Sequence, residues 1–166
     1  MKKHIYSGYV LQRGKSPIDG KPFVVILTTK TSNRKTGKML QVWILREDIN
    51  PVEAVATHED VSICGGCPHR KQLDGTRSCY VNAGQVPLSG WKAYKRGVYG
   101  QLSDLFPEHL EGRKIRWGAY GDPAIISPTL VALLNDHAAG HTGYTHQWRW
   151  PWAQWCKGVF QASCDG

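Results

Sequence analysis

Runs of apolar and β-branched residues predict strands in the first third of the chain. Residues 23–29 form one such run and residues 40–45 form another. The stretch between them, residues 30–38, is polar, basic and glycine-containing, which is typical of a long turn. We therefore expect an antiparallel hairpin within a β-rich N-terminal region that covers residues 1–60.

Two helices are indicated in the middle of the chain. Asn50 can cap a short helix, Pro51 suits its first turn, and Glu53 can reach back as in a capping box. A second helix is expected over residues 89–96, where Trp91 and the tyrosine three residues later share one face.

Strands and helices alternate from Lys114 onward. Residues 115–120 alternate between two faces as a strand does, and Ser127-Pro128 gives a cap and a first turn to a helix with an apolar stripe. A strand-like run over 142–149, a tryptophan-rich helix to Lys157 and a strand over 159–163 follow. This alternation is typical of βαβ units. The predicted fold class is α/β: a partial, incomplete (β/α) barrel-like parallel sheet, preceded by the N-terminal antiparallel β-hairpin region.

The pattern divides the chain into the β-rich region, residues 1–60, and a metal-binding βα domain, residues 61–166. The sequence ends just after a strand-like run. A buried parallel strand needs a covering helix. We therefore expect the βα domain to be truncated at its C-terminus.

Length, composition and charge limit the classes of protein to which this chain can belong. The 166 residues suffice for one core, and no apolar run approaches the ~20 residues of a membrane span. The basic N-terminus lacks the apolar stretch of a signal peptide, so we expect a cytoplasmic protein with no membrane partner. The formal charge of +8 is compatible with nucleic acid, but the basic residues are dispersed and accompany no nucleic-acid motif. Nucleic acid is therefore a possible partner without a specific signal, and no oligomeric state is indicated.

The strongest chemical signal is the spacing of Cys64, Cys67 and Cys79, which reads C-x2-C-x11-C and is followed by Tyr80. Small residues between thiols let a loop aim several sulfurs at one point. In the cytoplasm such thiols are more often metal ligands than disulfides. Both an iron–sulfur cluster and zinc fit, and zinc would take His69 as its fourth ligand. The other two cysteines, at positions 156 and 164, are expected to be buried thiols.

A second signal is the turn Gly121-Asp122-Pro123 after a predicted strand. Ligands of parallel α/β folds bind outside the carboxyl ends of strands, and a glycine lets backbone groups approach them closely. A plain turn is the alternative, because this triplet is good turn chemistry. We expect the turn to lie at the same sheet edge as the cysteine loop, and His146, on the next strand, to face the same pocket.

The cysteine loop ending in Cys-Tyr, followed by a helix and a strand that ends in a glycine–acid–proline turn, resembles the radical S-adenosylmethionine superfamily. The resemblance covers residues 61–164. It implies a partial (β/α) barrel in which Cys64, Cys67 and Cys79 hold a 4Fe–4S cluster. It also implies that Gly121-Asp122-Pro123 contacts S-adenosylmethionine, the small-molecule cofactor. The family's usual spacing is C-x3-C-x2-C, its turn has a second glycine, and its acid is glutamate.

The chain also resembles an uncharacterised family found largely in bacteriophages. The matching runs are residues 63–70, residues 79–82 and residues 143–149. This likeness implies a phage source and hence the host cytoplasm, but no activity. The two resemblances favour a radical-SAM-like iron–sulfur protein of unknown substrate, either active or a degenerate member that keeps the cluster. The alternative is a zinc-stabilised phage protein that binds nucleic acid or a host partner without catalysis.

Overall fold

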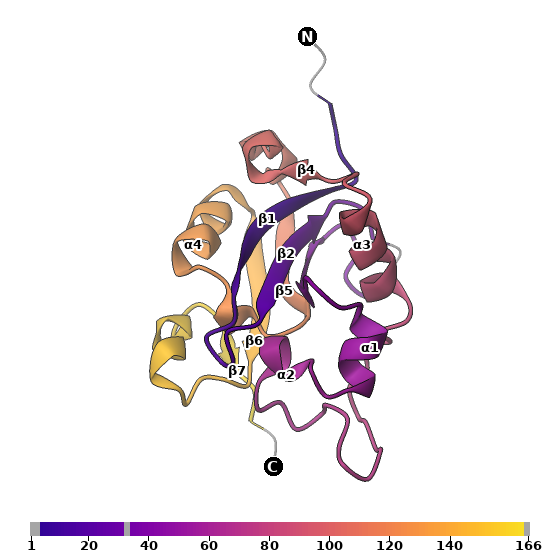
Figure 1. The fold of residues 1–166 in the computed structure, drawn as a ribbon. Helices are drawn as coiled ribbons and strands as arrows, with labels where there is room; N and C mark the ends of the chain where they lie inside the picture. Colours follow the sequence, from indigo (N-terminus) through magenta and orange to yellow (C-terminus); the bar gives the residue numbers. More distant parts are fainter. Residues whose placement is uncertain (1–3, 32–33, 165–166) are drawn as a thin grey trace.

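Seven strands form one sheet in the order β4-β1-β2-β3-β5-β6-β7. The structure is a computed structural model and describes residues 4–31 and 34–164. Figure 1 shows the sheet running through the middle of the molecule. The strands are β1 (Gly8–Lys15), β2 (Pro22–Thr28), β3 (Leu40–Arg46), β4 (Gly100–Gln101), β5 (Lys114–Tyr120), β6 (Gly140–Thr145) and β7 (Gln161–Ala162).

Strand direction decides where a ligand site can lie. β2 pairs antiparallel with β1 and with β3, whereas the pairs β3–β5, β5–β6 and β6–β7 are parallel. The carboxyl ends of β3, β5, β6 and β7 therefore share one edge. The predicted fold class is confirmed: an antiparallel hairpin region is followed by parallel strands, and the sheet is not closed into a barrel. Both regions of the sequence contribute strands to this one sheet.

Strand β1 was not predicted from the sequence. Its first half is buried and its second half alternates between partly buried and exposed positions, so it carries no single period. A shift of register between Val10 and Gln12, where β1 pairs with β2, interrupts the alternation. Such an irregularity hides a strand from pattern analysis, which depends on an unbroken period of two.

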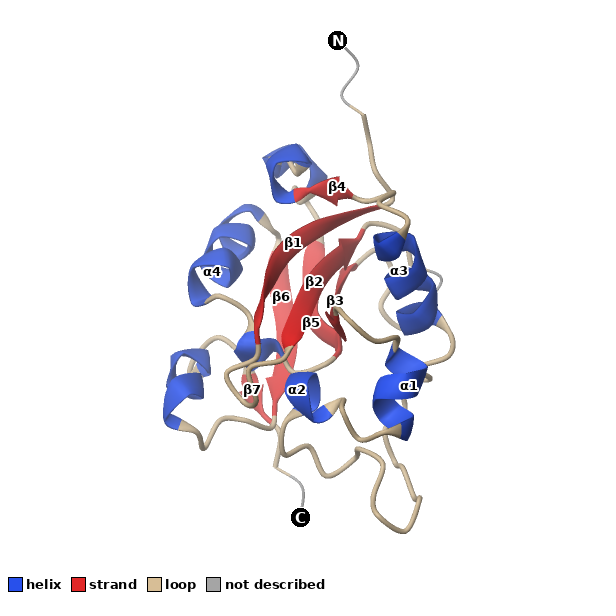
Figure 2. Cartoon of the chain, in the orientation of Figure 1, coloured by secondary structure: helices blue, strands red, loops and turns tan. Residues whose placement is uncertain are grey.

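Helices cover both sides of the sheet (Figure 2). They are α1 (Pro51–Ala56), α2 (Val61–Cys64), α3 (Val86–Lys95) and α4 (Pro128–His137). The predicted caps are confirmed: Asn50 accepts a hydrogen bond from the Glu53 amide, and Ser127 from the Leu130 amide. Within the described part of the chain, no helix has the length and apolar character to cross a membrane.

The C-terminal elements are shorter than the sequence pattern predicts. The Gln147 amide donates to the Thr145 side-chain oxygen at 3.0 Å, and the Trp150 amide donates to the Gln147 carbonyl at 2.9 Å. These bonds turn the backbone, so β6 ends at Thr145 instead of 149. The tryptophan-rich segment Pro151–Cys156 is a 3₁₀ helix, and the predicted strand over 159–163 contributes only Gln161–Ala162 to the sheet, parallel to β6 as expected.

The two faces of β5 serve different purposes. Ile115, Trp117 and Ala119 are buried, and the Trp117 indole N–H donates to Asn135 of α4 at 2.9 Å. Among the alternate residues, Tyr120 is also buried and belongs to the core, whereas Arg116 and Gly118 are only partly buried. The partly buried positions of β5 are therefore the ones available for a site.

We predict a clear difference between two adjacent leucines of α4. Leu134 is 2 % exposed and belongs to the core, whereas Leu133 is 50 % exposed. Leu134→Ala should lower the free energy of unfolding by about 2–5 kcal/mol, because it leaves a cavity. The matched control Leu133→Ala should change it by less than about 0.5 kcal/mol. Urea denaturation measures both, and equal losses would contradict the burial described here.

Candidate functional site

A pocket of about 330 Å³ opens at the carboxyl edge of the parallel strands. The cysteine loop, the end of β5 with its turn, and the end of β6 form its walls. All three loop cysteines line it, together with Gly121, Asp122 and His146. The structure thus brings together residues from three separate segments, as the sequence analysis expected. Pro123 lies outside the lining and is buried at the start of a 3₁₀ turn, Pro123–Ile125.

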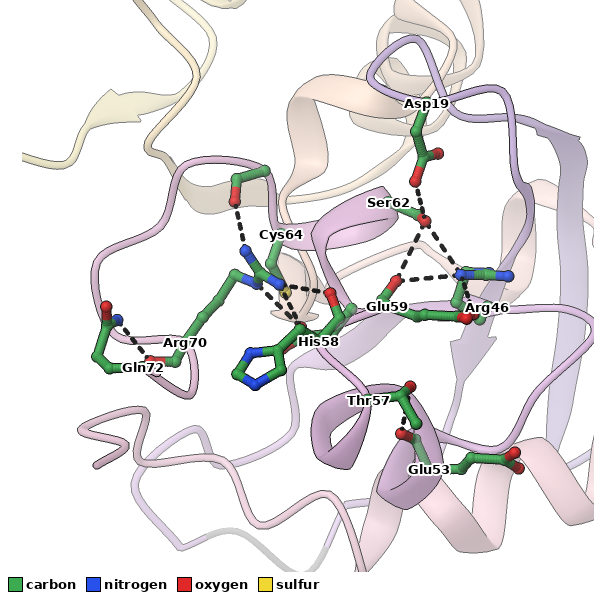
Figure 3. A network of polar contacts seen from close by, with 12 residues as sticks. Asp19, Arg46, Glu53, Thr57, His58, Glu59, Ser62, Cys64, Arg70 and Gln72 are labelled. Atoms are coloured by element: carbon green, nitrogen blue, oxygen red, sulfur yellow. Dashed lines mark hydrogen bonds and ion pairs between the residues drawn. The ribbon is translucent and has the colours of Figure 1, made fainter. Parts of the chain in front are cut away.

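A buried ion pair anchors the first part of the cysteine loop, and Figure 3 shows its arginine, Arg70, directed toward the backbone of His58. The Arg70 guanidinium contacts the Asp60 carboxylate at 2.7 Å, and Asp60 is almost fully buried. The same guanidinium donates to the carbonyls of His58, at 2.7 Å, and Gly65, at 3.3 Å. Removing either charge would leave its partner buried and uncompensated, which is costly. Arg70 therefore fixes the chain on both sides of Cys64.

The long spacing before Cys79 is folded back by backbone hydrogen bonds. The Cys79 amide donates to the His69 carbonyl at 2.9 Å, and the Gln72 amide donates to the Thr76 carbonyl at 2.7 Å. Arg77 continues the return by donating to the carbonyls of Cys79 and Val81, at 3.1 and 2.9 Å. An excursion of eleven residues therefore ends with the third cysteine in the same pocket as the first two.

The pKa of the Cys64 thiol depends on its burial and on the charges around it. Burial raises the pKa of its thiol well above the ordinary value, and Asp60, Cys67 and Cys79 raise it further, while Arg70 acts in the opposite direction. Charges on these sulfurs would therefore repel one another. A bound cation or cluster would remove this repulsion, because metal binding takes thiols as thiolates.

Asp122 is the point at which the three walls meet. Its backbone amide donates to the Ile63 carbonyl at 2.7 Å, which joins the turn to the cysteine loop. Its carboxylate accepts from the amides of Ala124, at 3.0 Å, and His146, at 2.8 Å. Burial nevertheless raises the pKa of this carboxyl, since desolvation outweighs the hydrogen bonds that lower it. The Asp122 carboxylate is thus occupied by hydrogen bonds to the backbone of the chain. The Gly121 backbone is the part of the turn that remains available to a ligand.

Gln147 is a site residue that the sequence analysis did not identify. It is almost fully buried, and its side-chain amide donates to the Cys64 carbonyl at 3.0 Å and to Asp122 at 3.4 Å. The position lies within a run that carried the phage resemblance, which was the available signal. Gly65 makes room for it: this glycine has φ of 56°, and a Cβ there would lie 2.4 Å from the Gln147 side-chain oxygen.

Two histidines stand at one side of the pocket. His146 Nε2 lies 4.0 Å from Cys67 Sγ, and the His146 and His69 rings have centroids 5.7 Å apart. His69 Nδ1 lies 2.8 Å from the Ser78 hydroxyl. His146 thus faces the pocket as predicted, and His69 stands beside it. Within residues 4–31 and 34–164, however, no group of three His, Cys, Asp or Glu side chains is arranged to hold a metal ion.

Two buried polar atoms of the pocket walls have no hydrogen-bond partner. They are the Tyr120 hydroxyl and the Arg77 Nε. Burial raises the pKa of Tyr120, and the neighbouring Cys64 raises it further. A buried polar group without a partner is costly. The Tyr120 hydroxyl and Arg77 Nε are therefore available to donate hydrogen bonds to a group bound in the pocket.

Comparisons with protein-family models, with curated proteins and with solved structures give no match to this chain.

We predict that Gly65 is essential to the shape of the loop. Gly65→Ala would place a methyl group against Gln147 and strain the backbone, so it should lower the unfolding free energy by more than about 1 kcal/mol. The matched control is Gly66→Ala, because a Cβ at Gly66 meets nothing within 4 Å. Thermal unfolding of both variants measures the difference. A Gly65→Ala variant as stable as Gly66→Ala would contradict the packing of Gln147 on this turn.

The raised pKa of Asp122 predicts a pH dependence of stability. Since the pKa is higher in the folded state, this group's contribution is fully present below its unfolded pKa, about 3.9, and is lost as pH rises through the folded-state value. The stability advantage of the native protein over Asp122→Asn should therefore shrink as pH rises from about 4 to 7. Urea unfolding of both proteins across this range measures it. An advantage that grows with pH would contradict the dominance of burial.

Proposed function

We propose that this protein is a radical-SAM-like iron–sulfur protein, with a 4Fe–4S cluster bound by Cys64, Cys67 and Cys79. The observation that carries the proposal is that all three cysteines line one pocket beside the Gly121 turn. The parallel strands β5 and β6 direct their carboxyl ends to this pocket, which is where α/β folds bind ligands. We further propose that the protein acts in the cytoplasm, that of the host if a phage encodes it.

The arrangement of the cysteines favours a cluster over a single zinc ion. Structural zinc needs four ligands that converge on one point, at about 2.3 Å for sulfur. No such convergence of three ligand side chains exists among the described residues. In a cluster each thiolate binds a different iron, so the three sulfurs need only surround a common space. A pocket of about 330 Å³ lined by three thiols meets that requirement.

The surrounding residues have distinct proposed roles. Gly121 would offer backbone groups to S-adenosylmethionine, and His146, next to Cys67, would lie at the boundary between cluster and cofactor. The unpartnered Tyr120 hydroxyl would donate to a thiolate or sulfide, and hydrogen bonds to sulfur raise the reduction potential of a cluster. When bound, the cluster would supply single electrons to the cofactor.

We predict that each loop cysteine is required for iron. The protein purified without oxygen should be brown and carry about four iron atoms. Cys64→Ser, Cys67→Ser and Cys79→Ser should each lose most of the iron and of the visible absorption, because only three protein ligands are available. Cys164→Ser is the matched control and should keep both, since Cys164 is exposed, which corrects the expectation of a buried thiol, and lies outside the pocket.

Iron analysis and absorption spectra distinguish the outcomes. A colourless protein with one zinc per chain, lost on substitution of His69, would contradict the cluster and support the zinc-stabilised alternative. Iron that persists in all three loop variants would contradict the assignment of the ligands.

A further inference from the structure

A second cavity, of about 320 Å³, lies on the face of the sheet that α4 does not cover. Strands β2 and β3 form its floor and the start of α3 forms a wall. Arg116 of β5 lines this cavity and also the cysteine pocket. The two cavities are therefore neighbours on one sheet face, and Arg116 stands at the boundary between them.

The charges that line the second cavity are all of one sign. Lys30 and Arg116 are its only charged lining residues, and no aspartate or glutamate of the described chain contributes to the lining. Lys30 is exposed and stands at the rim. Cations without nearby acids attract and hold anions. The cavity is therefore selective for negative charge.

Arg116 is held in place without being neutralised. Its guanidinium donates to the side-chain oxygen of Gln41, at 3.3 Å, and to the hydroxyl of Tyr80, whose ring it also covers. Gln41 lies opposite Arg116 in the β3–β5 register. Both partners are uncharged, so no acid neutralises the guanidinium, and its two hydrogen bonds orient it. A preorganised guanidinium of this kind suits planar recognition of a carboxylate or phosphate.

The rest of the cavity wall is mostly apolar and aromatic, with uncharged polar residues such as Ser7, Thr28 and Ser89 among them. Ile26, Leu45 and Pro87 are buried, and the Trp43 and Tyr99 rings are partly exposed. The Trp43 indole N–H donates to the Thr28 hydroxyl at 2.9 Å, so its polar atom is already satisfied. A ligand would therefore meet an apolar surface with a cation at one end, which is the composition of many small-molecule sites.

We propose that the second cavity binds a small molecule that carries a carboxylate or phosphate on an aromatic or apolar body. The anionic group binds to Arg116, with Lys30 at the rim, and the body packs on Trp43. The bound molecule lies beside the cysteine pocket, since Arg116 borders both. The inference stands on the residues of the second cavity and does not require that a cluster be present.

Three naphthalene compounds test the inference on the full protein as purified. They are 2-naphthyl phosphate, 2-naphthoate and uncharged 2-naphthol, which share one ring system. Isothermal titration calorimetry should show that at least one of the two anions binds about tenfold more tightly than 2-naphthol, because only the anions form charge-assisted hydrogen bonds with Arg116. Which anion binds more tightly identifies the natural oxyanion. Naphthol binding as tight as both anions, or no binding of any of the three, would overturn the proposal.

Substitutions of the two cations that line the second cavity test whether the anion binds there. Arg116→Gln should weaken the preferred anion about tenfold and leave 2-naphthol unchanged, and Lys30→Gln should weaken it less, because its charge is exposed and screened. Lys157→Gln, an exposed position outside the cavity, is the matched control and should bind as the native protein does. Lys30→Gln also serves if Arg116→Gln fails to fold, because Lys30 lies outside the sheet. Anion binding that neither substitution weakens would overturn the assignment to this cavity.

Discussion

The carboxyl edge of this sheet depends on the hydrogen bonds made by Asp122. The Asp122 backbone amide donates to the carbonyl of Ile63, next to the cysteine loop. The Asp122 carboxylate accepts a hydrogen bond from the His146 amide at the end of β6. Gln147 then joins the same carboxylate to the Cys64 carbonyl. In a buried site each of these bonds is worth more than at the surface, because the alternative is an unsatisfied polar group. Asp122 and Gln147 therefore join the cysteine loop, the β5 turn and the end of β6 at one place.

Polar contacts, and not the packing of apolar side chains, hold the cysteine loop in place. The loop has few buried apolar side chains between Cys67 and Val81, and Leu73 is almost fully exposed. Arg70 and Asp60 supply a paired, desolvated interaction that holds the loop's start, and backbone hydrogen bonds return its end. A loop held in this way keeps its three cysteines in the lining of one pocket.

The partly buried positions of β5 adjoin both cavities. Trp117 packs in the core and is bonded to α4, and Tyr120 is buried as well, whereas Arg116 is only partly buried and lines both cavities. Gly121 brings the turn close to β3, since a Cβ at this position would lie 2.7 Å from that of Ile44. Small residues at the edge and an uncompensated cation in the middle leave room and charge for ligands along the same face.

The sequence by itself determined the local elements and identified the cysteine loop as the candidate site. The caps at Asn50 and Ser127, the hairpin of β2 and β3 and the parallel strands follow from short-range patterns, because capping and periodicity depend on residues a few positions apart. The three cysteines could be selected because their spacing and small neighbours are local properties. The tertiary structure alone decided how β1 joins the sheet, that β6 ends at Thr145, and that Asp122 serves the chain through its carboxylate. The tertiary structure alone placed Gln147 against Gly65. It also placed Arg116 between two cavities. Both arrangements join residues that lie far apart in the sequence and that only the folded sheet brings together.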